Sequence, residues 1–166
     1  MKNLKLFIIA LLIGIPSMYS QEVQGKITFN NSPNETINTD DPYVVNLFKY
    51  FKTGKHKIMF TFKGDYPSKG SKPEFSFFKF KTTVKHNGKT IKVLERDPMP
   101  YLPGDMLIPT EAYDFIYILS VYKQDGMSYS KNTGAIPKGR YEIIIEAVPI
   151  EVEGSINKGV ITLNIN

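Results

Sequence analysis

Asn87 and Gly88 interrupt the longest alternating segment of the protein, EFSFFKFKTTVKHNGKTIKVLE, residues 74–95. An Asn-Gly pair supplies the two positive-φ positions of a type I′ turn, which joins neighbouring antiparallel strands. Counting outward from the turn pairs Val84 with Ile91 and gives the hairpin two unlike faces. One face is predicted to carry Phe80, Thr82, Val84, Ile91 and Val93, and the other Lys79, Lys81, Thr83, Lys85, Thr90 and Lys92.

Other apolar or alternating segments, separated by Gly, Pro and Asn turns, predict the remaining strands. They span residues 23–29, 57–63, 112–123, 141–147 and 159–166. The segment 112–123 is apolar on both faces and is therefore expected in the middle of a sheet, whereas residues 30–42 and 96–111 are expected to be loops. About seven strands without regular strand–helix alternation predict an all-β fold, an antiparallel sandwich.

A short helix is predicted near residues 42–52. Val44, Leu47, Phe48 and Phe51 recur at helical spacing, and Asp41 precedes them as a capping residue. We expect this helix to cover one end of the sandwich.

The stretch GAIPKGRYEIIIEA, residues 134–147, places a Pro-Lys-Gly turn directly before Tyr141. It resembles the entry to the sixth strand of immunoglobulin-like domains, where a tyrosine hydroxyl bonds back to the corner backbone. Ile143 occupies the position at which antibody domains carry a cysteine, and the protein has no tryptophan. The resemblance therefore implies an immunoglobulin-like sandwich without a disulfide, and it assigns no functional residue.

Residues 1–20 have the order of a secretory signal. Lys2 and Lys5 precede an apolar run at 6–15, and Ser17 and Ser20 lie before an expected cleavage at Gln21. The run is much shorter than the roughly 20 residues that span a bilayer. We predict a secreted or periplasmic protein with no membrane span after cleavage and a single β-sandwich domain at residues 21–166.

Composition narrows the classes of partner and chemistry. The sequence has no cysteine, which excludes disulfides and thiolate metal sites. Removal of Lys2 and Lys5 leaves 19 basic and 16 acidic side chains, a balance of +3 that does not favour nucleic acid.

No motif of a catalytic or cofactor site is present. His56 and His86 stand among lysines at turns and are expected to be solvated, and Glu142 and Glu146 share a strand face expected to face solvent. We therefore predict no catalytic residue, no cofactor and no metal, although a hydrolase with an unfamiliar site is an alternative.

Asn38, Asp40 and Asp41 offer oxygen ligands for calcium, but they are fewer than the six or more that calcium usually takes. The alternative role for Asp41 is to cap the helix that follows it.

Two sets of residues are candidate binding sites. Lys79, Lys81, Lys85 and Lys92 form the predicted basic face, which either binds an anionic partner or keeps the sheet from pairing with other sheets. Tyr66, Tyr101 and Tyr129 lie in predicted loops, where they either form a glycan platform or pack their rings against the core.

These features together predict an exported, non-catalytic binding module. Its expected partner is a protein in the cell envelope or outside the cell, as for an accessory subunit, an inhibitor or an immunity-type protein. The alternative is a carbohydrate-binding module for an acidic or neutral glycan.

Overall fold

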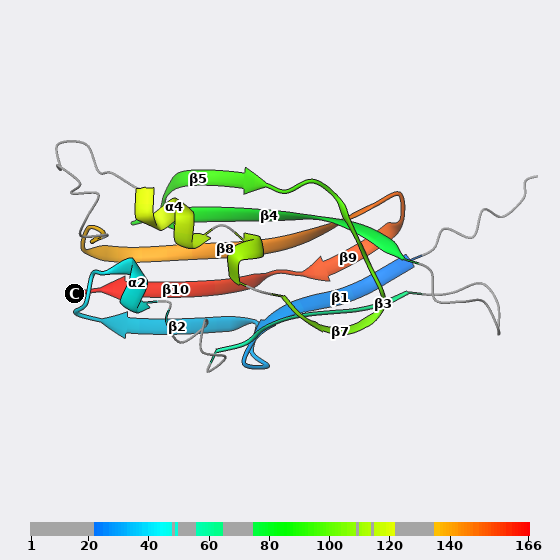
Figure 1. Ribbon diagram of the computed structural model, residues 1–166, viewed down its shortest axis with the longest axis horizontal. Helices are drawn as coiled ribbons and strands as arrows, with labels where there is room; N and C mark the ends of the chain where they lie inside the picture. Colours follow the sequence, from blue (N-terminus) through cyan, green and yellow to red (C-terminus); the bar gives the residue numbers. More distant parts are fainter. Residues whose placement is uncertain are drawn as a thin grey trace, which may run out of the picture.

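The computed structural model describes residues 22–47, 49, 56–64, 75–108, 110–113, 115–121 and 135–166; the predicted signal, residues 1–20, lies outside them. The described part forms strands with three short helical elements (Figure 1). In chain order these are β1 (Glu22–Phe29), β2 (Asn34–Thr39), α2 (Val44–Leu47), β3 (Ile58–Gly64), β4 (Ser76–His86), β5 (Lys89–Glu95), β6 (Met99–Tyr101), β7 (Gly104–Leu107), the 3-10 helix η1 (Thr110–Tyr113), α4 (Phe115–Val121), β8 (Gly139–Ile150), β9 (Glu153–Asn157) and β10 (Gly159–Ile165).

Two β-sheets pack against each other, which confirms the predicted all-β sandwich. The four-stranded sheet has the order β7-β3-β1-β9, and the six-stranded sheet runs β2-β10-β8-β4-β5, with β6 also pairing with β4. Both sheets are mixed, because β1 is parallel to β9 and β2 is parallel to β10. The prediction of purely antiparallel sheets is therefore wrong, and the immunoglobulin-like topology stays a prediction.

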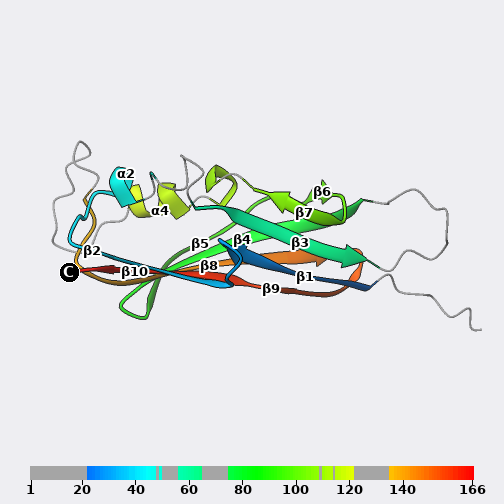
Figure 2. The same ribbon diagram turned by 90° about the horizontal axis from the view of Figure 1, so that it is seen from below.

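The inner face of the six-stranded sheet is covered by two kinds of structure. In the side view of Figure 2, α2 and α4 lie on the same side of this sheet as β3 and β7 of the four-stranded sheet. Strand β1 contacts β8 and β10, while η1 and α4 contact β4. The inner face of the six-stranded sheet is thus buried partly by the four-stranded sheet and partly by the helices.

The β4–β5 hairpin turns at Asn87 and Gly88, as predicted, and both residues have positive φ angles, 47° at Asn87 and 81° at Gly88. The predicted register holds for the first two pairs, His86 with Lys89 and Lys85 with Thr90, but an irregularity follows, and Val84 pairs with Lys92. Ile91 is thus the extra residue of a β-bulge.

The bulge changes which side chains of β5 face the core. Thr82 pairs with Leu94, and Val93 pairs with Thr83, one position away from the predicted register. Ile91 and Leu94 pack against the core, whereas Val93 is exposed. Ile91 and Leu94 are three positions apart, and strict alternation along a strand cannot bury both. The prediction that Val93 faces the core was therefore wrong.

Phe60 of β3 stands at the centre of an aromatic cluster between the sheets. Its ring centroid lies 5.4 Å from that of Phe62, 5.0 Å from Phe78, 5.4 Å from Phe80 and 5.6 Å from Tyr101. Three of these four contacts are edge-to-face, the arrangement that the charge distribution of aromatic rings favours. The cluster joins β3, β4 and β6 across the two sheets.

Tyr141 forms the corner predicted from the sequence. Its side chain is fully buried, and its hydroxyl donates a hydrogen bond to the Pro137 carbonyl at 2.7 Å. Along β8 the buried positions alternate with partly exposed ones from Tyr141 to Ala147, as predicted. The start of β8 is therefore held in place by the Tyr141 side chain, which bonds to the turn that precedes the strand.

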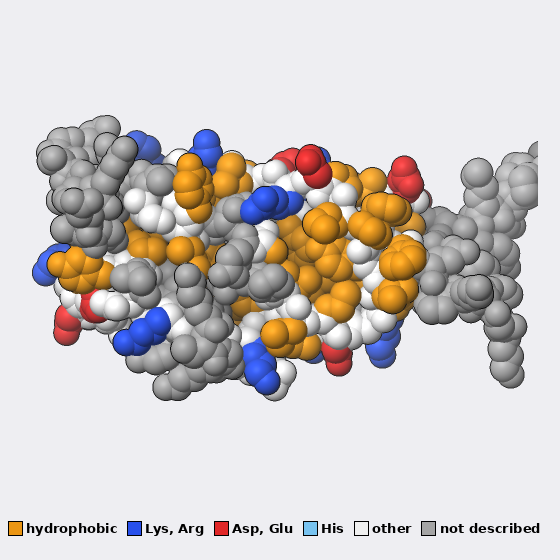
Figure 3. Space-filling view, in the orientation of Figure 1, with side chains coloured by type: hydrophobic (Ala, Val, Ile, Leu, Met, Phe, Trp, Pro, Cys, Tyr) orange, Lys and Arg blue, Asp and Glu red, His pale blue; other side chains and the backbone are white. Residues whose placement is uncertain are grey.

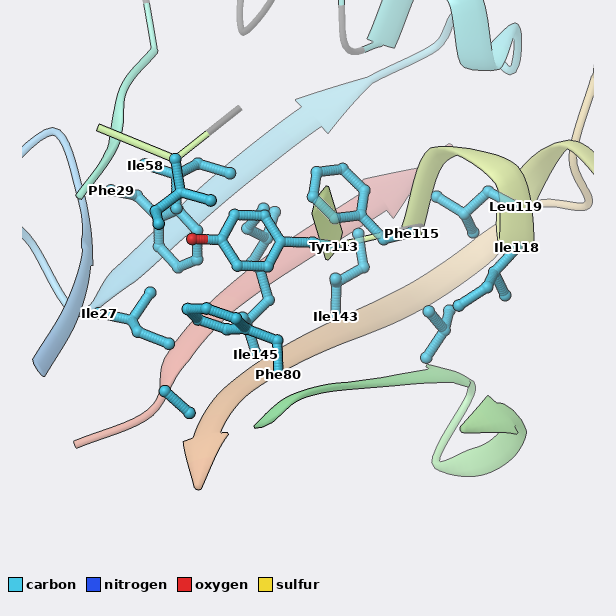
Figure 4. Close-up of a cluster of buried hydrophobic side chains, with 14 of the residues drawn as sticks. Ile27, Phe29, Ile58, Phe80, Tyr113, Phe115, Ile118, Leu119, Ile143 and Ile145 are labelled. Atoms are coloured by element: carbon cyan, nitrogen blue, oxygen red, sulfur yellow. The ribbon is translucent and has the colours of Figure 1, made fainter. Parts of the chain in front are cut away.

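The prediction of a central strand at 112–123 is wrong, because residues 112–113 end η1 and residues 115–121 form α4; residues 114, 122 and 123 lie outside the described part of the chain. Phe115, Ile118 and Leu119 are buried, while Tyr117 and Ser120 are exposed. Figure 4 shows Tyr113 and Phe115 beside Ile143 of β8. An apolar run gives the same signal for a buried strand and for a helix whose inner side is buried.

Four strands occupy segments in which no strand was expected. Strand β2 lies within the predicted loop 30–42, β6 and β7 lie within 96–111, and β9 precedes the last strand. The predicted helix near 42–52 is confirmed for Val44–Leu47, which form α2, whereas residues 48 and 50–52 lie outside the described part of the chain. Asp41 holds the start of this helix, since its carboxylate accepts hydrogen bonds from the backbone N–H of Tyr43, the residue before α2, and from the side-chain amide of Asn46 within it, both at 2.9 Å.

Candidate functional site

Three of the four candidate lysines lie on the outer face of β4, next to carboxylates. Lys79 Nζ is 3.2 Å from Glu95 Oε2, and Lys81 Nζ is 3.6 Å from Glu146 Oε2. Lys85 pairs in register with Glu142 of β8. Acidic side chains of the two neighbouring strands therefore offset much of the positive charge that the sequence places on β4.

Lys92 does not belong to that row. Because of the bulge at Ile91, its register partner is Val84, whose side chain is buried in the core. Lys79, Lys81 and Lys85 alternate with such buried positions along β4. The structure therefore groups three of the predicted basic residues and separates the fourth.

Glu142 and Glu146 are half-buried rather than freely solvated. Glu142 accepts a hydrogen bond from the Arg140 guanidinium at 2.9 Å, and Glu146 pairs with Lys81. The outer face of β4 and β8 is thus a band of alternating charges.

The candidate tyrosines are not brought together among the described residues. Tyr66 and Tyr129 lie outside this part of the chain. Tyr101 lies on β6 with its ring 5.6 Å from Phe80 and from Phe60, and burial raises the pKa of its phenol. Its ring packs against the core, which is the second of the two roles considered for it.

His86 is buried, so its predicted solvation is wrong. Its imidazole stacks on the Tyr141 ring with a centroid distance of 4.2 Å, and Nε2 lies 2.9 Å from the Lys138 carbonyl. Since a carbonyl only accepts, Nε2 is the donor in this bond. His86 therefore packs the corner against the β4–β5 turn.

His56 lies beside the turn that joins β1 to β2. Its Nδ1 is 2.8 Å from the Asn30 amide nitrogen and 3.4 Å from a carboxylate oxygen of Glu35. Asn30 also accepts a hydrogen bond from the Lys57 backbone through its side-chain oxygen. These contacts connect the start of β3 to the β1–β2 turn.

The described ranges contain no candidate metal site, because no group of three or more His, Cys, Asp or Glu side chains within them could hold an ion. Of the calcium candidates, Asp41 accepts hydrogen bonds from Tyr43 and Asn46 at the start of α2, and Asn38 accepts one from the Asn164 amide at 2.7 Å.

The connection from β6 to β7, residues 99–107, forms a strap between the two sheets. Strand β6 pairs with β4 of one sheet, and β7 pairs with β3 of the other. Tyr101 and Met106 pack inward against the core. Met99, Leu102 and Leu107 are exposed by 57%, 43% and 62%, so the strap presents three large apolar side chains to solvent.

Figure 3 shows hydrophobic side chains gathered on the half of this face where β3 and β7 lie in Figure 1. A depression of about 500 Å³ adjoins the strap, lined by Phe62, Lys63 and the segment 103–105 among others. Thr61 on β3 donates a hydrogen bond to Asp105 on the strap at 2.7 Å. The apolar surface is therefore attached to the sandwich by both backbone and side-chain contacts.

Sequence reasoning missed the strap because its prolines indicated a connection and nothing more. The signal that could have found it is the density of large apolar residues between those prolines: Met99, Tyr101, Leu102, Met106 and Leu107. An ordinary solvated loop is mostly polar, so such residues indicate either burial or an interface.

No protein-family model matches the chain, and no curated protein or solved structure matches it either. In the part of the chain that the structure describes, every helix is too short or too polar to cross a membrane.

Proposed function

We propose that the protein is an exported, non-catalytic β-sandwich module that binds another protein through the strap. The observation that carries the proposal is the exposure of Met99, Leu102 and Leu107 on one short connection. A gathering of exposed apolar side chains is a typical mark of a protein-binding surface, because covering it removes apolar area from water.

The chemistry of the exposed side chains favours a protein over a glycan. Methionine and leucine are flexible aliphatic groups that pack against the irregular apolar surface of a protein. Sugar platforms use exposed aromatic rings, and the one aromatic ring of the strap, Tyr101, is packed into the core cluster. The ion pairs of Lys79 and Lys81 also weaken the case for a strongly anionic partner.

The proposed export is supported by residues 1–20, which have the order of a secretory signal: two lysines, an apolar run and small residues before Gln21. The partner is then a protein of the cell envelope or of the outside. An accessory subunit, an inhibitor and an immunity-type protein all belong to this class.

The test is affinity capture from the envelope of the source cells with a double variant, Leu102→Ser with Leu107→Ser. Tyr117→Ser is the matched control, because Tyr117 is 62% exposed and lies on α4, outside the strap. We expect the wild type and the control to retain the same partner, and the double variant to lose at least about tenfold in affinity.

Equal recovery of that partner by the double variant would contradict the assignment to the strap. Recovery of no partner by the wild type would contradict the proposed function itself. The near-ultraviolet circular dichroism of each variant shows whether it keeps the packed core.

A further inference from the structure

Strand β2 lies at the margin of the six-stranded sheet, with β10 on one side (Figure 1). The Val160 N–H bonds to the Pro33 carbonyl, and the Asn166 N–H bonds to the Thr39 carbonyl. Successive residues of a strand direct their backbone groups to opposite sides. The backbone N–H and carbonyl groups of the odd-numbered residues of β2 therefore point toward β10. Those of Asn34, Thr36 and Asn38 point toward the free edge of the sheet.

These three residues differ in what their backbone groups already bind. The N–H and the carbonyl of Asn34 are both bonded to the Ser32 hydroxyl, at 3.2 and 2.7 Å. Within the described residues, no strand pairs with Thr36 or Asn38 from the outer side. The free edge thus offers two consecutive outward residues, each with one donor and one acceptor.

The other margins of the two sheets carry features that discourage pairing with another strand. Strand β5 is bulged and bears Lys89 and Lys92, and β7 is only four residues long. Strand β9 contains Gly154 with a φ of 133°, outside the extended range. Bulges, lysines and short length are common protections of an edge, and β2 has a regular ladder with none of them.

We propose that β2 pairs in antiparallel orientation with β2 of a second copy of this chain. A twofold contact places each residue opposite a residue of the same strand, so the strand has to be complementary to itself. If the axis passes at Ile37, Thr36 of each copy lies opposite Asn38 of the other. Both hydrogen-bonded pairs are then formed by the free backbone groups.

The side chains suit this register. Ile37 is half-buried against the core and meets Ile37 of the second copy, which removes more apolar area from water. Glu35 lies opposite Thr39, so the one charged residue of β2 does not meet itself. By contrast, twofold pairing of β5 would bring its lysines toward each other.

The contact is small and gives a weak dimer that dissociates on dilution. It goes beyond the proposed function, because the strap belongs to a different part of the sandwich and does not take part in it. Loss of self-pairing would leave partner capture through the strap unchanged, so the two proposals fail separately.

The absence of cysteine from the sequence makes a direct test possible. In the proposed register the two Ile37 residues form a non-hydrogen-bonded pair, whose Cα atoms lie about 4.5 Å apart, within the range of a disulfide. Ile37→Cys should form a disulfide dimer under mild oxidation at least about tenfold faster than Val93→Cys on β5 or Ser155→Cys on β9. Non-reducing electrophoresis over time measures the three rates.

Light scattering of the unmodified protein over a dilution series provides the second measurement. We expect a monomer–dimer equilibrium that Thr36→Pro shifts at least about tenfold toward monomer. Proline removes an N–H that points away from β10, so the native ladder is kept; circular dichroism checks the fold, and if this variant does not fold, the cysteine rates decide. Equal cross-linking rates at the three cysteines, or a protein that is monomeric at every concentration, would overturn the proposal.

Discussion

Tyr141 and Tyr113 are both buried in the same sandwich, but their hydroxyl groups have opposite surroundings. The Tyr141 hydroxyl bonds to the Pro137 carbonyl at 2.7 Å. The Tyr113 hydroxyl has no hydrogen-bond partner among the described residues, and Figure 4 shows it directed toward Phe29 and Ile58. One ring therefore fixes a turn, whereas the other fills space between the sheets.

The two hydroxyl groups differ because only one of them lies near a backbone carbonyl that is free to accept a hydrogen bond. Tyr141 stands just after a turn, and a turn leaves carbonyl groups outside the strand ladders. Tyr113 projects from η1 into a layer of apolar side chains, where carbonyl groups are already bonded within strands. A buried hydroxyl stabilises the fold only where the backbone supplies a partner, and elsewhere its desolvation costs free energy.

The largest effect is expected from Gly139→Ala, which breaks the corner through its backbone. Gly139 has a φ of 132°, and an added Cβ would lie 2.6 Å from both Asn87 Oδ1 and His86 Nε2. We expect a loss of about 3 kcal/mol in the free energy of unfolding, from backbone strain and steric overlap together. Urea denaturation measures it.

Gly88→Ala is the matched control for this variant. Gly88 also has a positive φ, 81°, but an added Cβ would meet nothing within 4 Å. It should lose clearly less stability than Gly139→Ala. Equal losses would mean that strain alone explains both and that the packing of the corner against the β4–β5 turn contributes nothing.

Alkaline pH should lower the free energy of unfolding through the buried phenol of Tyr113. Burial raises the pKa of the Tyr113 phenol above its ordinary value of 10.0. The unfolded chain therefore releases this proton first, so the stabilisation is complete below pH 10 and is lost as the pH rises above it. At pH 11 the wild type should have lost about 1.4 kcal/mol more than Tyr113→Phe, each relative to its own value at neutral pH.

Chemical denaturation of the two proteins at a series of pH values measures this difference. The other tyrosines are present in both proteins and cancel in the comparison, except that the nearby Tyr101 phenolate adds to the rise in the pKa of Tyr113. Parallel stability curves up to pH 11 would show that the Tyr113 phenol ionises as easily in the folded protein as in the unfolded chain.

Tyr141→Phe keeps the ring and removes one hydrogen bond. We expect a loss of about 1 kcal/mol, because the Pro137 carbonyl is left without its partner. The midpoint of thermal unfolding reports the change. An unchanged midpoint would show that the corner is held by ring packing against His86 and not by the hydroxyl.

Tyr113→Phe should have the opposite sign. Removing an unpartnered hydroxyl abolishes its desolvation cost, and the phenyl ring keeps the contact with Phe80, so we expect a gain of about 1 kcal/mol at neutral pH. The same thermal measurement applies. A loss of stability here would contradict the contrast between the two tyrosines.

Much of the sandwich could be predicted because its central strands show their buried face directly. The alternation from Tyr141 to Ala147 and the Asn87-Gly88 turn are local signals, and both are confirmed. The bulge at Ile91 could not be read in the same way. It depends on which neighbours bury Leu94, and that is a property of the assembled sheet.

The edges and the candidate site were harder to predict. Strand β2 carries a single large apolar residue, Ile37, so its sequence resembles a polar loop; its pairing with β10 supplies the order. His86 is buried because Tyr141, far away in the sequence, stacks on it. Lys79 and Lys81 could be placed on one face, but the carboxylates beside them come from separate strands.

The two parallel pairs set a condition on the time course of folding. Strand β1 lies beside β9, and β2 lies beside β10, so the earliest strands of the chain join the latest ones. During synthesis β1 can pair early with β3, but its other edge and the whole of β2 wait for β9 and β10, which are made late. Contacts this distant in sequence make folding slow, and they leave the growing chain open for longer to chaperones or to transport in an extended form.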